Sequence, residues 1–151
     1  MRVATTAIFF VAMSLPIVAR AQAPADCAAV GTPPASAVTP QPAMSAKISL
    51  ALCQAEGSFG ALHLAPDDAS IAAMNSAAAP SLQLLDEVIH AGDATFAPIA
   101  TKAKAGLLVA MVVRMRNSIP PITATTVGPA LAQHDQAHAA LEPKLAAWLN
   151  Q

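Results

Sequence analysis

The stretch PDDASIAAMNSAAAPSLQLLDEVIHAGD, residues 66–93, predicts a long amphipathic helix with a marked beginning and end. Asp67 and Asp68 place negative charge where the helix dipole favours it, and Gly92 with Asp93 predicts the end. The stripe between them keeps its phase across Pro80, which points to the solvent side, so we expect one bent helix rather than two. Apolar residues recur there every three or four positions: Ile71, Met74, Ala78, Leu82, Leu85 and Ile89.

The same spacing predicts three further helices, at about 43–63, 93–116 and 125–150. Short connections between long helices favour antiparallel neighbours. We therefore predict an all-α fold, an up-down-up-down four-helix bundle, over residues 44–151. The run GLLVAMVV, residues 106–113, is apolar on all sides, so we expect it to be packed on several sides. It is too short to cross a bilayer.

The N-terminal residues predict export. Residues 1–21 have a positive start at Arg2, an apolar run and small residues before the expected cleavage site after Ala21, as in a secretory signal peptide. Residues 22–43 are rich in proline and lack apolar periodicity, which predicts an extended or disordered leader. The expected location is periplasmic or secreted, with no membrane span after cleavage.

Two cysteines support an oxidising compartment. Cys27 and Cys53 are the only cysteines in the chain, and an even pair in an exported protein is most simply a disulfide. A redox or metal pair would favour CxxC spacing, which is absent.

The charge balance limits the kinds of partner. Without Arg2 and Arg20, six of the eight Lys and Arg remain against nine Asp and Glu, a net charge near −3. Nucleic acid is therefore not an expected partner. Charged residues make up only 11% of the chain. A surface so poor in charge suits contact with another protein or self-association, although the alanine bias of a GC-rich genome would also produce it.

The motif HDQAH, residues 134–138, resembles a zincin motif with one change. In HExxH two histidines one turn apart bind zinc and the glutamate is the general base, whereas this chain has the shorter Asp135 at that position. A catalytic zinc also needs a third protein ligand, for which Glu142 is the only candidate after the motif. A zincin-like hydrolase is therefore not expected, and we predict no catalytic residue.

The helical wheel places both histidines within the apolar stripe of the last helix. They would then be hydrogen-bonded or half-exposed residues, ligands of a metal or haem site, or a pH-sensitive contact. A metal site would use His134, His138 and Glu142, with zinc, copper or haem as the group bound and Met44 as a further axial candidate. Counting equal depths from the turn near Pro121 places His138 level with Lys104 of the preceding helix.

Arg114 lies in the stripe of the third helix and is a possible anion contact. Its alternative role is to neutralise the helix C-terminus or to extend to solvent. Three functional hypotheses remain open. The first is a non-enzymatic exported binding or interaction protein, the second a metal or haem binding protein using His134 and His138. The third is a small enzyme in which Arg114 and Lys104 hold an anionic substrate.

Overall fold

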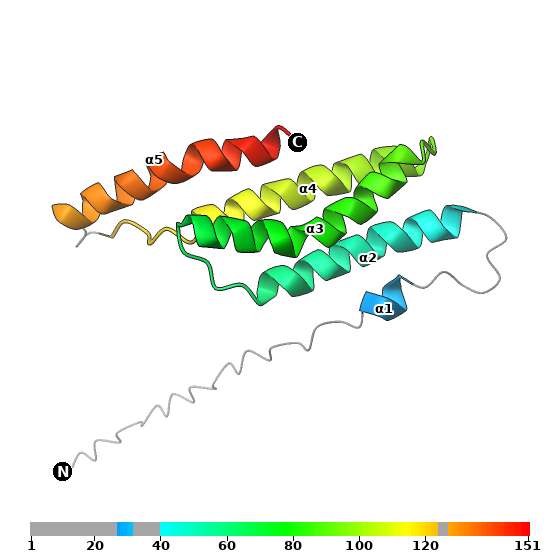
Figure 1. Ribbon diagram of the computed structural model, residues 1–151, viewed down its shortest axis with the longest axis horizontal. Helices are drawn as coiled ribbons and strands as arrows, with labels where there is room; N and C mark the ends of the chain where they lie inside the picture. The colour runs from blue at the N-terminus through cyan, green and yellow to red at the C-terminus, as the bar shows by residue number, and fades with distance from the viewer. Residues whose placement is uncertain (1–26, 32–39, 124–126) are drawn as a thin grey trace, which may run out of the picture.

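The computed structural model describes residues 27–31, 40–123 and 127–151, and within them all regular structure is helical. Figure 1 shows four long helices that alternate in direction, α2 (Pro40–Gly60), α3 (Asp68–His90), α4 (Phe96–Arg116) and α5 (Pro129–Leu149). The one-turn helix α1 (Cys27–Val30) lies beside α2. The prediction of an all-α, up-down-up-down four-helix bundle is confirmed. The predicted signal peptide lies outside the described residues.

The N-terminal boundary of the bundle differs from the prediction. α2 begins at Pro40, whereas the sequence predicted a start at about residue 43. Pro40 and Pro42 read as helix-breaking residues, yet both lie in the first turn of α2. Proline is tolerated there because the first N–H groups of a helix have no intrahelical acceptor. Most of the predicted leader, residues 22–26 and 32–39, lies outside the described residues.

The boundaries of α3 follow from its capping residues. Asp67 has an extended backbone, and its Oδ1 accepts a hydrogen bond from the N–H of Ser70 at 2.7 Å. Gly92 adopts a left-handed φ of 69°, which suits glycine after a helix end. Asp93 then accepts hydrogen bonds from the backbone N–H groups of Thr95 and Phe96, at 2.8 and 3.0 Å, and so begins α4. Pro80 lies exposed inside α3, which is a single helix as predicted.

The disulfide between Cys27 and Cys53 is present and joins α1 to α2, with the two Cα atoms 5.6 Å apart. The prediction of this pairing is therefore confirmed. Residues 32–39, between α1 and α2, lie outside the described residues. Among the described residues, the disulfide is the covalent link that holds α1 against the bundle.

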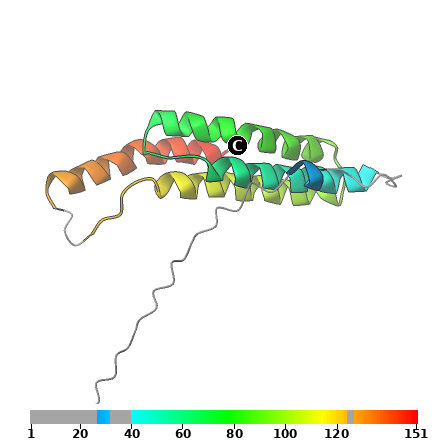
Figure 2. The same ribbon diagram turned by 90° about the horizontal axis from the view of Figure 1, so that it is seen from below.

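The core lies between α2, α3 and α4, which all contact one another, and α5 joins them through α4 and through an ion pair from Lys144 to Asp68 of α3. Figures 1 and 2 both show α5 beginning beyond the end of α4, so that its N-terminal half projects from the bundle. Only the C-terminal half of α5 contributes buried residues. The largest fully buried side chains are Met74, Ser81, Leu85, Val88, Met111, Met115 and Leu145.

The expectation that residues 106–113 are packed on several sides holds in part, because α4 contacts α2, α3 and α5 but keeps one face exposed. Leu107, Leu108, Met111 and Val112 are buried, but Val109 and Val113 are 51% and 48% exposed. The reason is that α5 covers only one side of α4, near its C-terminal end. As a whole, α4 is long and apolar enough to cross a membrane by length and composition, with 28% of its most apolar window buried. Core helices of soluble proteins can have the same length and composition, but they are mostly buried.

Candidate functional site

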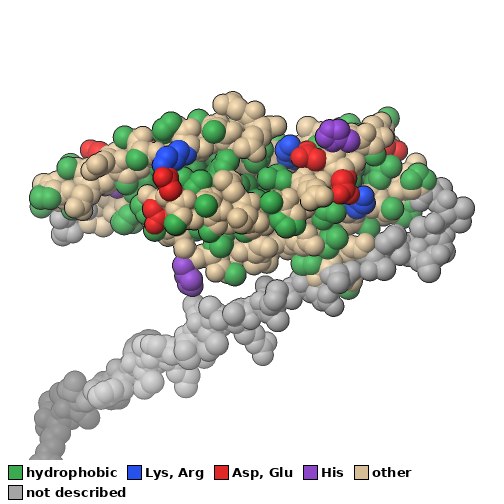
Figure 3. Space-filling view, viewed as in Figure 1, with side chains coloured by type: hydrophobic (Ala, Val, Ile, Leu, Met, Phe, Trp, Pro, Cys, Tyr) green, Lys and Arg blue, Asp and Glu red, His purple; other side chains and the backbone are tan. Residues whose placement is uncertain are grey.

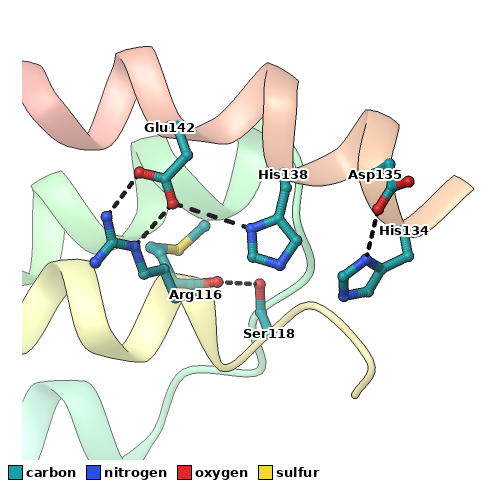
Figure 4. Close-up of polar contacts among 7 residues, drawn as sticks. Arg116, Ser118, His134, Asp135, His138 and Glu142 are labelled. Atoms are coloured by element: carbon teal, nitrogen blue, oxygen red, sulfur yellow. Dashed lines mark hydrogen bonds and ion pairs between the residues drawn. The ribbon is translucent and has the colours of Figure 1, made fainter. Parts of the chain in front are cut away.

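His134 and His138 lie on the projecting half of α5, not in the interior of the bundle. Figure 4 shows both imidazoles pointing from α5 toward the connection that follows α4. Their side chains are 17% and 40% exposed, and the ring centroids are 4.7 Å apart with planes inclined by 54°. The spacing of one helical turn predicted this proximity. The wheel could not predict that α5 leaves the bundle at this point.

Each imidazole has its Nδ1 atom directed to a carboxylate. His134 Nδ1 lies 3.3 Å from Oδ1 of Asp135, and His138 Nδ1 lies 4.0 Å from Oε1 of Glu142. The second distance is an electrostatic contact rather than a hydrogen bond. A carboxylate beside Nδ1 favours the tautomer that carries its proton there, which leaves the lone pair on Nε2.

Glu142, the third predicted metal ligand, is held by Arg116. The guanidinium donates through Nε to Oε1 at 2.8 Å and through Nη2 to Oε2 at 2.6 Å. These hydrogen bonds, with the positive charge of Arg116, hold the pKa of the Glu142 carboxyl below its ordinary value. Because both carboxylate oxygens accept from Arg116, Glu142 is placed beside the histidines rather than as a free ligand. Within the described ranges, no group of three or more His, Cys, Asp or Glu side chains could hold a metal ion.

The predicted register between α4 and α5 is wrong. In the structure, Glu142 lies opposite Arg116, the last residue of α4. In a tight hairpin, a residue near the start of α5 would lie there instead. α5 is therefore shifted along α4, and its first residues extend beyond the end of α4. The counting assumed that the chain turns at Pro121, but α5 begins only at Pro129. His138 is therefore not level with Lys104. Lys104 instead forms an ion pair with Asp86 of α3, with Nζ and Oδ1 2.9 Å apart.

Arg114 binds the end of α2. Its Nη1 donates to the carbonyl oxygen of Phe59 at 3.1 Å, and its guanidinium carbon lies 5.6 Å from the centroid of the Phe59 ring. α2 ends at Gly60, so Arg114 places a cation on a carbonyl group of its last turn, which favours positive charge. Arg114 and Lys104 thus have separate partners on different helices, and the structure does not bring them together around one anion.

The remaining candidate ligands lie elsewhere. Met44 is in the first turns of α2, and α2 has no contact with α5. Figure 1 shows that these first turns lie at the end of the bundle away from the projecting half of α5. His90, at the end of α3, contacts the carbonyl oxygen of Asp86 through Nδ1 at 2.7 Å. Met44 is therefore not placed as an axial partner for His134 and His138.

A groove between α2 and α4 was not predicted from the sequence. It has a volume of about 310 Å³ and is lined by residues of both helices, among them Leu52, Phe59, Ala103, Gly106 and Ala110. Small side chains such as Ala103 and Ala110 leave this space between the helices. Leu52 is 45% exposed beside the groove.

The surface is poor in charge, and its charges are largely paired. On the face seen in Figure 3, cationic side chains lie next to anionic ones and apolar side chains fill much of the surface between them. The described ion pairs between helices join Lys47 to Glu87, Lys104 to Asp86, Arg116 to Glu142 and Lys144 to Asp68.

No protein family, curated protein sequence or solved structure matches this chain.

Proposed function

We propose that this chain is a non-enzymatic interaction protein whose contact surface is an exposed apolar face of α4. We call this face the α4 stripe. It consists of Ile99, Gly106, Val109 and Val113, which fall within about 80° around the helix at 100° per residue. Ile99, Val109 and Val113 are between 48% and 51% exposed.

The exposure of β-branched apolar side chains along one helix face is the observation that carries the proposal. Single exposed apolar residues are common, but several on one helix face are typical of a contact surface, and Lys102 lies in the same sector of α4 between Ile99 and Val109. Covering a half-exposed valine contributes on the order of 1 kcal/mol, so a partner on the α4 stripe would gain from several side chains at once. The groove with α2 extends this surface toward Leu52.

A second copy of the chain fits the α4 stripe. Ile99 and Val113 each lie seven residues from Gly106, so two antiparallel α4 helices that cross at Gly106 place each Ile99 opposite the Val113 of the other copy. Val109 faces Ala103 in the same arrangement, and Lys102 faces Ala110, so no like charges meet. A Cβ atom added at Gly106 would meet nothing within 4 Å, which leaves its surface open to close approach.

The disulfide supports an oxidising location for this interaction, either periplasmic or secreted. Disulfides are rare in the cytosol because thiols are kept reduced there. The paired surface charges favour contact by apolar packing over steering by a strong electric field.

Sedimentation equilibrium of the purified protein tests the proposal. We expect a monomer–dimer equilibrium in the micromolar range. Val109→Glu and Val113→Glu should each shift it to monomer, because the dimer would bury the new carboxylate in an apolar contact. Val127→Glu is the matched control, since Val127 is 70% exposed and lies outside the α4 stripe. A wild-type protein that is monomeric at all concentrations, or a dimer that survives both α4 substitutions, would contradict the proposal.

A further inference from the structure

We infer that His134 and His138 form a labile binding site for a divalent first-row transition-metal ion, with Cu(II) bound most tightly. The two imidazoles lie one turn apart on α5 with ring centroids 4.7 Å apart. Two histidines at this spacing on one helix face are the arrangement that presents two nitrogen ligands to one metal ion. The site lies on the projecting half of α5 and is separate from the α4 stripe, so each can be tested without the other.

The orientation of the rings is the second observation. Histidines that bind metals usually direct their other ring nitrogen to a carboxylate or carbonyl group, which fixes the tautomer and raises the basicity of the ligating nitrogen. Here Asp135 and Glu142 lie beside the two Nδ1 atoms, at 3.3 and 4.0 Å. Figure 4 shows the two Nε2 atoms turned away from these carboxylates. The Nε2 atoms are therefore the ligands.

The position of Glu142 is itself fixed. Its two hydrogen bonds to Arg116 hold the carboxylate against α4 and beside His138, so it does not turn to bind the metal. The role of Glu142 differs from the sequence prediction, in which it was the third ligand. It positions His138, and the protein supplies two ligands rather than three.

The ligand set favours copper among the common divalent ions. Imidazole suits copper, zinc and nickel, and the stability order of the divalent ions places Cu(II) above the others. Both cysteines are in the disulfide, so no thiolate competes for the metal. Two protein ligands leave coordination positions open to water or to a small exogenous ligand. Such a site exchanges its metal readily and does not hold the fold together.

Titration of the purified full chain with CuCl2, followed by calorimetry and electron paramagnetic resonance, tests the inference. We expect one Cu(II) per chain with hyperfine coupling to imidazole nitrogen. His134→Ala and His138→Ala should each weaken binding at least about tenfold, because loss of an outer partner of a ligand alone costs about 10- to 100-fold. Asp135→Ala should weaken binding less than His134→Ala does.

The matched control moves one histidine without removing it. His138→Ala combined with Ala139→His keeps the composition but separates the two rings by about 140° around the helix, so binding should fall as in His138→Ala. His90→Ala removes a histidine of α3 and should leave binding unchanged. Circular dichroism confirms that each variant folds. Wild-type affinity in the double variant His134→Ala with His138→Ala, or in the moved variant, would overturn the inference.

Discussion

Arg116 of α4 and Glu142 of α5 form an ion pair through two hydrogen bonds, Nε to Oε1 at 2.8 Å and Nη2 to Oε2 at 2.6 Å. The pair joins the last residue of α4 to the middle of α5. The pair therefore lies where α5 passes the end of α4. The C-terminal half of α5 packs on the bundle, and its N-terminal half projects. A guanidinium binds a carboxylate at two points in a defined geometry, so this pair favours one register over its neighbours.

Glu142→Gln should lower the thermal midpoint slightly at neutral pH, because the ion pair is about half exposed. The pKa of the Glu142 carboxyl is lowered in the folded protein by its hydrogen bonds to Arg116. The contribution of the ion pair to the free energy of unfolding is therefore present above the ordinary carboxyl pKa of 4.5. It is lost as the pH falls through the lowered pKa of Glu142 in the folded protein. The difference in midpoint between wild type and Glu142→Gln, measured from neutral to acid pH, should shrink in that window. A difference that does not depend on pH would contradict this role.

The two halves of α5 should differ in their importance for stability. Leu145→Ala removes a side chain that is 1% exposed and should cost about 2–5 kcal/mol in the free energy of unfolding. Leu131→Ala, in the projecting half, removes one that is 39% exposed and should cost less than about 1 kcal/mol. Urea denaturation monitored by circular dichroism measures both. Equal losses would show that the whole of α5 is packed on the bundle.

Gly106→Ala should raise the stability of the monomer. Gly106 lies inside α4, where glycine costs roughly 0.5–1 kcal/mol relative to alanine. A Cβ atom there meets nothing within 4 Å, so no strain offsets the gain. Denaturation at low protein concentration, where the chain is monomeric, measures the effect. A loss of stability in the monomer would mean that another group occupies this space.

Reduction of the disulfide should destabilise the protein by about 3.5 kcal/mol, because it frees a closed loop of 26 residues in the unfolded chain. Urea denaturation with and without a phosphine reductant measures the change. The double variant Cys27→Ser with Cys53→Ser is the control, since it should match the reduced protein and not respond to the reductant. A variant as stable as the oxidised protein would show that the bridge adds nothing to stability.

The local features of the fold could be predicted from the sequence, and its register could not. Asp67 and Gly92 mark the ends of α3 by hydrogen bonding and backbone conformation that depend on a few adjacent residues. The position of α5 depends instead on the path of the connection from Asn117 to Gly128, for which no short pattern codes. The contact between Arg116 and Glu142 was missed for that reason.

The same limit applies to the candidate sites. The spacing of His134 and His138 predicted their proximity correctly, because one helical turn separates them in any structure. Periodicity cannot predict which apolar faces find a partner, so Val109 and Val113 read as core although both are half exposed. Likewise, Arg114 was recognised as unusual, but its contact with Phe59 required the packing of α2 on α4.

Cross-linking through a cysteine at position 106 tests the central claim most directly. If two α4 helices cross at Gly106, Gly106→Cys meets its own copy and forms a covalent dimer on mild oxidation, which a non-reducing gel detects. Ile99→Cys and Val113→Cys should each remain monomeric alone, because the two copies of either residue lie roughly 20 Å apart, and should form a heterodimer when mixed. A Gly106→Cys protein that remains monomeric, or cross-links no faster than Val127→Cys, would contradict self-association through the α4 stripe.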